Sequence, residues 1–206
     1  MNRLSLLFLF SLTLISCQAK PRAGQFKDDI EPSPDMKTEI ITLGGGCYWC
    51  VEAVFQQLRG VLSTKSGFMG GHIPNPTYEQ ICTKTTGHIE VIQVTFKPDQ
   101  ITRDELLTWF WKSHDPTDAG GQGADRGPQY RTAIFYHSPE QKAAAEASMK
   151  KAQPDFKAPI VTLLRPAATF YPAPEEHQDY YFRMKTQNPY CRYVITPKLE
   201  KLNLQK

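Results

Sequence analysis

Basic runs are missing from this chain, as is any stretch in which basic and aromatic residues alternate. The 24 lysines and arginines slightly outnumber the 21 acidic residues, and the net charge of +3 is spread along 206 residues. We therefore expect no nucleic-acid partner. Internal repeats are missing too, and this length suffices for one domain with a sizeable core.

Cysteine is scarce, and the pattern of the few cysteines argues against zinc. Five occur, and four of them follow Cys17: Cys47, Cys50, Cys82 and Cys191. Cys47 and Cys50 form a CxxC motif, but no second CxxC or spaced histidine pair follows, so we expect no metal site. A domain of this size needs no disulfide staples. The Cys47–Cys50 pair is therefore expected to carry out redox chemistry.

The N-terminus begins with one arginine and an apolar run, Leu4–Ile15, that is short for a bilayer span but fits a secretory signal. The run ends in "LISC", which resembles the bacterial lipoprotein box, whose cysteine is lipidated. We expect a signal peptide over residues 1–16 and an exported protein, lipid-anchored in the cell envelope through Cys17. An ordinary signal peptide with an unrelated cysteine is the alternative. Residues 17–36 are polar and proline-bearing, as in a flexible tether.

Hydrophobic periodicity predicts strands that alternate with helices. Thr38–Gly46 is rich in β-branched residues, and His88–Pro98 is apolar on both faces, so both indicate buried strands. Apolar residues at i, i+3, i+4 and i+7 from Val51 predict a helix that ends near Gly60. Further strands are predicted at 61–71, 132–137 and 159–173, and further helices at 75–85, 101–114, 138–153 and 175–189. This alternation predicts an α/β or α+β sandwich, with a glycine-rich loop over residues 115–131.

The stretch "GGGCYWCVE", residues 44–52, places Cys47 between the first strand and the first helix. A thiol attacks as its thiolate, and the free N–H groups and positive dipole at a helix N-terminus lower a thiol pKa. The glycines allow a sharp turn and a close approach of substrate to the backbone. The stretch predicts an activated Cys47 thiolate, and a tight turn around two buried cysteines is the alternative. Cys50 faces the same side of the helix, so it can form a disulfide with an oxidised Cys47.

Five motifs follow one another along the chain: "GGCYWCVEAVF", "PNPTYEQICTKTTGHIEVIQVTF", "HDPT", "GQGADRGPQYRTAIF" and "EEHQDYY". Together they resemble the A-type peptide methionine sulfoxide reductases. The resemblance implies an enzyme that reduces the S epimer of methionine sulfoxide, free or in proteins. It also implies a single domain with a two-layer α/β sandwich and a mixed central sheet. This reductase domain is expected over residues 37–197, followed by a C-terminal tail at 198–206.

By this resemblance Cys47 is the nucleophile, in a signature of glycine, cysteine, an aromatic residue and tryptophan. Tyr48 and Trp49 correspond to the aromatic pair that holds the methyl group of the substrate. The polar residues of the family's site correspond to Tyr78, Glu90, Asp125 and Tyr130. At Tyr48 and Cys50 the chain departs from the commoner motif, which has phenylalanine and glycine.

Glu90 has the position that an acid catalyst requires. A sulfoxide oxygen is a poor leaving group until it is protonated, so thiolate attack on sulfur needs a nearby acid. Glu90 shares a strand face with apolar residues, and burial there raises a carboxyl pKa and keeps the group protonated at neutral pH. A glutamate paired with a cation is the alternative. Tyr78 and Tyr130 offer phenolic donors to the same oxygen, whereas Asp125 either accepts from water or orients a tyrosine.

The expected products of the attack are methionine and a sulfenic acid on Cys47, which a second thiol converts to a disulfide. We favour Cys50 as this resolving thiol because of the helix spacing. Cys191 is the alternative, because the family commonly uses a cysteine of its tail. An external thioredoxin-type dithiol then reduces the disulfide, and no bound cofactor is expected. Cys82 ends a predicted helix and is expected to be a buried, inert thiol.

Two other functions fit the cysteine pair on its own. A thioredoxin-like thiol–disulfide oxidoreductase also has CxxC between a strand and a helix, but it gives no reason for the tyrosine and carboxylate motifs. A non-enzymatic, anchored binding lipoprotein would contain a structural Cys47–Cys50 bond. We favour the reductase, acting as a monomer. In its motifs we expect His88, His114 and His177 to be hydrogen-bonded scaffold residues.

Overall fold

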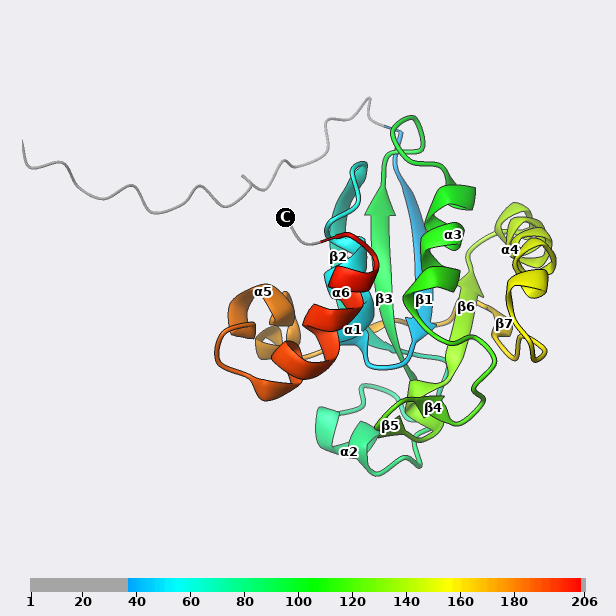
Figure 1. Ribbon diagram of the computed structural model, residues 1–206. Helices are drawn as coiled ribbons and strands as arrows, with labels where there is room; N and C mark the ends of the chain where they lie inside the picture. Colours follow the sequence, from blue (N-terminus) through cyan, green and yellow to red (C-terminus); the bar gives the residue numbers. More distant parts are fainter. Residues whose placement is uncertain (1–36, 205–206) are drawn as a thin grey trace, which may run out of the picture. The chain divides into compact units, whose positions relative to one another are not determined.

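The computed structural model describes residues 37–204, so the expected signal peptide, Cys17 and the tether lie outside the described range. Within it, six strands form one sheet in the order β7-β6-β1-β3-β2-β8 (Figure 1). They are β1 (Glu39–Gly45), β2 (Val61–Met69), β3 (Ile89–Phe96), β6 (Thr132–Tyr136), β7 (Leu163–Pro166) and β8 (Tyr171–Pro172). Only β6 and β7 pair in parallel, so the sheet is mixed, as expected.

Helices cover one face of this sheet. The helices are α1 (Tyr48–Phe55), α2 (Tyr78–Cys82), α3 (Arg103–Ser113), α4 (Pro139–Ala152), α5 (Tyr180–Met184) and α6 (Thr196–Lys201). Both α1 and α3 pack against β1, and α4 packs on α3 and β6 (Figure 1). The main core lies between these helices and the sheet. The opposite face carries a smaller apolar cluster that Leu163, Ala167 and Phe170 cover, so the two-layer expectation is confirmed.

Strand β3 has the alternation that burial on both faces requires. Ile89 and Val91 belong to the smaller cluster, whereas Ile92 and Val94 belong to the main core on the other face. Because side chains alternate along a strand, Glu90 shares the face of the main core, where it is 3% exposed. The strand therefore carries one carboxyl group into the protein interior on the side of α1.

Side-chain caps begin three of the helices. The side chains of Thr77 before α2 and Thr102 before α3 each accept the backbone N–H of the residue three positions on. The side chains of those residues, Gln80 and Glu105, accept the backbone N–H of the threonine in return. The Ser138 side chain accepts the Gln141 N–H at the start of α4, without a bond in return. Each such cap stabilises its helix by about 1 kcal/mol. The starts of these helices were therefore predictable from local sequence.

The C-terminal segment differs most from its prediction. In place of one helix at 175–189, the chain forms a 3-10 turn, Glu175–His177, and the short α5. Asp179 interrupts them because its φ of 52° is left-handed. A π-helix, Cys191–Ile195, then leads into α6. Leu199 of α6 is 1% exposed and belongs to the main core, so the expected boundary of the tail falls inside a packed helix.

Cys82 is exposed, so the prediction that it is a buried thiol is wrong. It ends α2, a helix of five residues in which Ile81 is the one buried residue, so the end of this helix faces solvent. Across residues 37–204, none of the helices has the length and apolar character needed to cross a membrane.

Candidate active site

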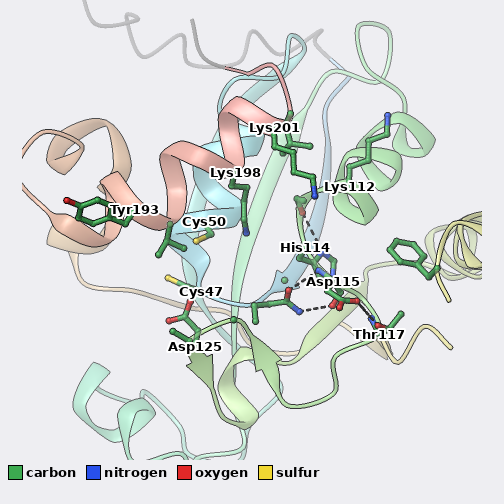
Figure 2. Close-up of a pocket in the computed structure, with 18 of the residues that line it drawn as sticks. Cys47, Cys50, Lys112, His114, Asp115, Thr117, Asp125, Tyr193, Lys198 and Lys201 are labelled. Atoms are coloured by element: carbon green, nitrogen blue, oxygen red, sulfur yellow. Dashed lines mark hydrogen bonds between the residues drawn. The ribbon is translucent and has the colours of Figure 1, made fainter. Parts of the chain in front are cut away.

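Cys47 lies at the junction of β1 and α1, as predicted. Gly46 before it has a positive φ of 93°, and a Cβ there would lie 2.6 Å from the side chain of Gln122, so glycine is required. The Cys47 carbonyl accepts the N–H groups of the residues three and four positions on, at 3.1 and 3.4 Å, which closes the first turn of α1. Cys47, the candidate nucleophile, is therefore the residue at which α1 begins, and it lies beside Asp125 (Figure 2).

The aromatic pair Tyr48 and Trp49 is held by residues from the C-terminal part of the chain. The Tyr48 hydroxyl forms a hydrogen bond with His177 Nδ1 at 2.6 Å. This bond gives a partner to the hydroxyl group, which the phenylalanine of the commoner motif would lack. Trp49 stacks on Tyr180, with ring centroids 3.7 Å apart and planes at 6°. Tyr78 lies against His177, with ring centroids 4.4 Å apart. Both rings of the pair are therefore fixed in orientation.

The three motif histidines are hydrogen-bonded, as predicted. His88 accepts the Gly71 N–H at 3.1 Å through Nδ1 and bonds with the Ile73 carbonyl at 2.8 Å through Nε2. His114 bonds with the Thr132 hydroxyl at 2.7 Å and with a carbonyl of α3. Burial lowers the pKa of His114 to about 3, so this ring stays neutral.

Glu90 lies buried beside the first turn of α1. The Tyr48 N–H donates to Glu90 Oε2 at 3.1 Å. Burial raises the pKa of Glu90 to about 8; the Tyr48 N–H opposes this shift and the charge of Asp125 adds to it. The predicted rise is confirmed, and the carboxyl holds its proton at neutral pH. Burial and the charge of Glu90 also raise the pKa values of Tyr78 and Tyr130, so both phenols remain hydrogen-bond donors.

The two thiols are coupled, and the predicted activation falls on the other cysteine. Burial raises the pKa of Cys47, and its hydrogen bond with Cys50 adds to the rise. The prediction that the helix N-terminus lowers the pKa of Cys47 is therefore wrong, because removal from water outweighs the helix dipole. The bond from Cys47 lowers the pKa of Cys50 to about 7 against the effect of burial, and the charge of Lys198 contributes. Once the pair carries one negative charge, the two thiols therefore share the remaining proton through this hydrogen bond.

The C-terminal segment supplies site residues that the sequence did not predict. The Tyr190 hydroxyl donates to Asp125 Oδ2 at 2.5 Å and lies 3.3 Å from the Cys50 sulfur. Cys191 is buried. Lys198 of α6 points toward the two thiols in Figure 2. Tyr190 directly precedes Cys191, which was already a candidate resolving thiol. This position is the one signal in the sequence that pointed to Tyr190.

A cavity of about 770 Å³ opens on both thiols. It lies among the β4 (Gly121–Gln122) and β5 (Asp125–Arg126) ribbon, the end of α3 and α6 (Figure 2). Among the predicted site residues, its lining includes Cys47, Cys50 and Asp125. Three of the remaining predicted residues, Tyr48, Tyr78 and Tyr130, gather around Glu90, and Trp49 lies beside Tyr48. The charges of Glu90 and Cys47 act on all three of these tyrosines, so Cys47 belongs to both groups.

The family model for peptide methionine sulfoxide reductase matches residues 39–206. The chain belongs to this family. It is 55% identical over 166 residues to the peptide methionine sulfoxide reductase MsrA of Thermus thermophilus. The aligned residues cover 81% of this chain and 94% of that relative. The reduced form of Mxr1 from Saccharomyces cerevisiae superposes with a TM-score of 0.72 at 32% identity, over 78% of this chain and 92% of that one. Mxr1 from the same yeast, solved in complex with Trx2, superposes with a TM-score of 0.53 at 27% identity. That match covers 73% of this chain and 89% of the Mxr1 chain.

This peptide methionine sulfoxide reductase is therefore an enzyme that reduces methionine sulfoxide, and the resemblance drawn from the five motifs is confirmed. The mixed sheet and single domain agree with the yeast structure. The two alternatives, a thioredoxin-like oxidoreductase and a binding lipoprotein, are not supported.

Replacing Asp125 with asparagine should lower the pKa of Glu90 from about 8, because it removes a negative charge that adds to the rise. Carbon-detected NMR titration of the Glu90 carboxyl measures the change. Asp118→Asn is the matched control, since Asp118 pairs with Arg126 elsewhere in the same loop. A Glu90 titration that responds equally to both substitutions, or to neither, would show that the charge of Asp125 does not raise this pKa.

Proposed function

We propose that this reductase acts on the S epimer of methionine sulfoxide, free and in proteins, with Cys47 as nucleophile and Glu90 as acid. One observation carries this assignment. The backbone N–H next to Cys47 donates to the Glu90 carboxyl at 3.1 Å, so a protonated acid lies beside the thiol. The choice of epimer rests on the resemblance to the A-type enzymes.

The first step transfers oxygen from the substrate to Cys47. As the Cys47 sulfur attacks the sulfoxide sulfur, its own proton passes to Cys50 along their hydrogen bond, and Glu90 gives its proton to the sulfoxide oxygen. Tyr78 and Tyr130 hold that oxygen through their phenolic protons. Methionine leaves with both electrons of the former bond to oxygen, and Cys47 remains as a sulfenic acid. The fixed rings of Tyr48 and Trp49 bind the methyl group of the substrate.

Cys50 resolves the sulfenic acid in the second step. It lies one helical turn from Cys47 and forms a hydrogen bond with that thiol in the reduced protein, so the two sulfurs are already close together. Its attack forms a Cys47–Cys50 disulfide and releases water. Cys191 remains the alternative, because it is buried close enough to Cys50 for the charge of that thiol to raise its pKa.

A thioredoxin-type dithiol returns the disulfide to two thiols. The support for such a partner is the yeast relative Mxr1, which was solved in complex with Trx2. Exchange proceeds through a mixed disulfide with the attacking thiol, and the cavity on both sulfurs gives that thiol access. We infer a monomer that needs no bound cofactor, which sedimentation and reconstitution from the purified chain and a dithiol would test.

With Cys47→Ser the S epimer should no longer be consumed. The R epimer should persist even with the unmodified enzyme. The measurement is chiral chromatography of a racemic methionine sulfoxide derivative incubated with dithiothreitol. Glu90→Gln should slow the first step by about 10²- to 10⁴-fold, since it removes the acid. Glu146→Gln, on the exposed side of α4, is the control for a change of charge. Loss of both epimers, or full activity without Cys47, would overturn the assignment.

Cys50→Ser should leave Cys47 as a trappable sulfenic acid after one turnover without reductant, whereas Cys191→Ser should still give the Cys47–Cys50 disulfide. Peptide mass spectrometry with a sulfenic-acid trap distinguishes these products. The reason is that Cys50 lies one helical turn from Cys47 and is hydrogen-bonded to it in the reduced protein. A Cys47–Cys191 bond in the unmodified protein would show instead that the C-terminal cysteine resolves.

We also propose that the enzyme is exported and lipid-anchored in the cell envelope through Cys17. The support is the "LISC" sequence after an apolar run, followed by a polar tether. Bacterial expression of the full chain should place it in the membrane fraction with a lipid mass on Cys17, and Cys17→Ala should abolish both. Full chain in the soluble cytoplasmic fraction would contradict the anchor.

A further inference from the structure

Tyr190 joins the Cys50 thiol to the Asp125 carboxylate through one hydroxyl group. It donates to Asp125 Oδ2 at 2.5 Å, and its oxygen lies 3.3 Å from Cys50 Sγ. A phenol has a single proton. While that proton is in the bond to Asp125, the Tyr190 oxygen can only accept a proton from the Cys50 thiol. The three groups therefore form a chain of hydrogen bonds that runs from Cys50 through Tyr190 to Asp125.

This chain becomes important when Cys47 is oxidised. In the reduced protein, the hydrogen bond with Cys47 does most to lower the pKa of Cys50. A sulfenic acid at Cys47 no longer has that thiol proton, so Cys50 needs another way to lose its own. Cys50 is 3% exposed, and the Tyr190 oxygen is the group 3.3 Å from its sulfur.

The surroundings of Cys50 offer one carboxylate to receive its proton. Within the described part of the chain, the titratable groups that act on Cys50 or are acted on by it are Cys47, Glu90, Asp125, Tyr190, Cys191 and Lys198. Glu90 is already protonated, and Lys198 is a cation without a free lone pair. Asp125 is therefore the acceptor, and Tyr190 is the group that contacts both ends.

We propose that Tyr190 is a catalytic proton relay for the resolving thiol. The inference rests on the proposed function, in which Cys50 attacks the Cys47 sulfenic acid. As the Cys50 sulfur bonds to the Cys47 sulfur, the Cys50 proton moves to the Tyr190 oxygen and the Tyr190 proton moves to Asp125. The sulfur–oxygen bond breaks, and hydroxide takes the proton from Asp125 and leaves as water. The thiol sulfur is oxidised, the sulfenic sulfur is reduced, and Asp125 is a carboxylate again.

The position of Tyr190 suits a concerted transfer. Burial and the neighbouring thiols raise its pKa, so a free tyrosinate does not accumulate and both protons move together. The ring lies edge-on to Trp49, with centroids 6.0 Å apart. Its backbone N–H donates to Asn188 Oδ1 at 2.7 Å. These contacts hold the hydroxyl between its two partners.

The test is Tyr190→Phe, which keeps the ring and removes the hydroxyl. The full chain is mixed with excess methionine sulfoxide and no reductant, then quenched over time. Methionine reports the first step, and the Cys47–Cys50 disulfide, measured by mass spectrometry, reports the second. We expect disulfide formation to slow by about 10²-fold and methionine formation to change far less. The slowed step should rise about tenfold per pH unit below the thiol pKa, because Cys50 must then lose its proton to solvent.

Tyr193→Phe is the matched control, because Tyr193 is three residues further along and 72% exposed. It should change neither step. Asp125→Asn removes the proton acceptor and should also slow disulfide formation. Weaker substrate binding cannot cause this slowing, because the disulfide forms after methionine has left. Unchanged disulfide formation in Tyr190→Phe, an equal loss in both steps, or a Cys47–Cys191 disulfide would overturn the relay. If no methionine forms in the unmodified enzyme, the proposed function itself fails.

Discussion

The bond from the Tyr48 backbone N–H to the Glu90 carboxyl ties the first helix to the central strand. Cys47 begins α1 without a side-chain cap, so the first free N–H of the helix needs an acceptor from elsewhere. Glu90 supplies it from β3. The N–H favours the ionised carboxyl and burial favours the neutral one; burial wins, and the pKa settles near 8. One residue thus completes the helix and holds the acid beside the thiol.

Local patterns predicted the parts of the site that depend on neighbours in sequence. Alternation along β3 predicted that Glu90 is buried, and the glycine turn predicted that Cys47 begins a helix. The pKa of Cys47 could not be predicted in this way, because its burial depends on segments that pack over α1. Cys82 was misjudged for a related reason: five residues of α2 are too few for a periodic pattern to show which end is covered.

The C-terminal contribution had no local signature. His177 and Tyr180 lie in a recognised motif, yet their contacts with Tyr48 and Trp49 join residues far apart in sequence. Tyr190 and Lys198 follow an interrupted helix, and a π-helix carries Cys191 into the core. Such geometry follows from packing rather than periodicity, which is why a tail was expected there. The family match extends through these residues.

The distance in sequence between Cys47 and Tyr190 has a consequence for the nascent chain. Cys47 and Cys50 are synthesised long before Tyr190 and α6, which complete their surroundings. Until those later residues arrive, the thiol remains hydrated and ionises as a free cysteine does in water. The unfinished polypeptide carries ordinary cysteines, and the enzyme's chemistry begins only with the completed fold.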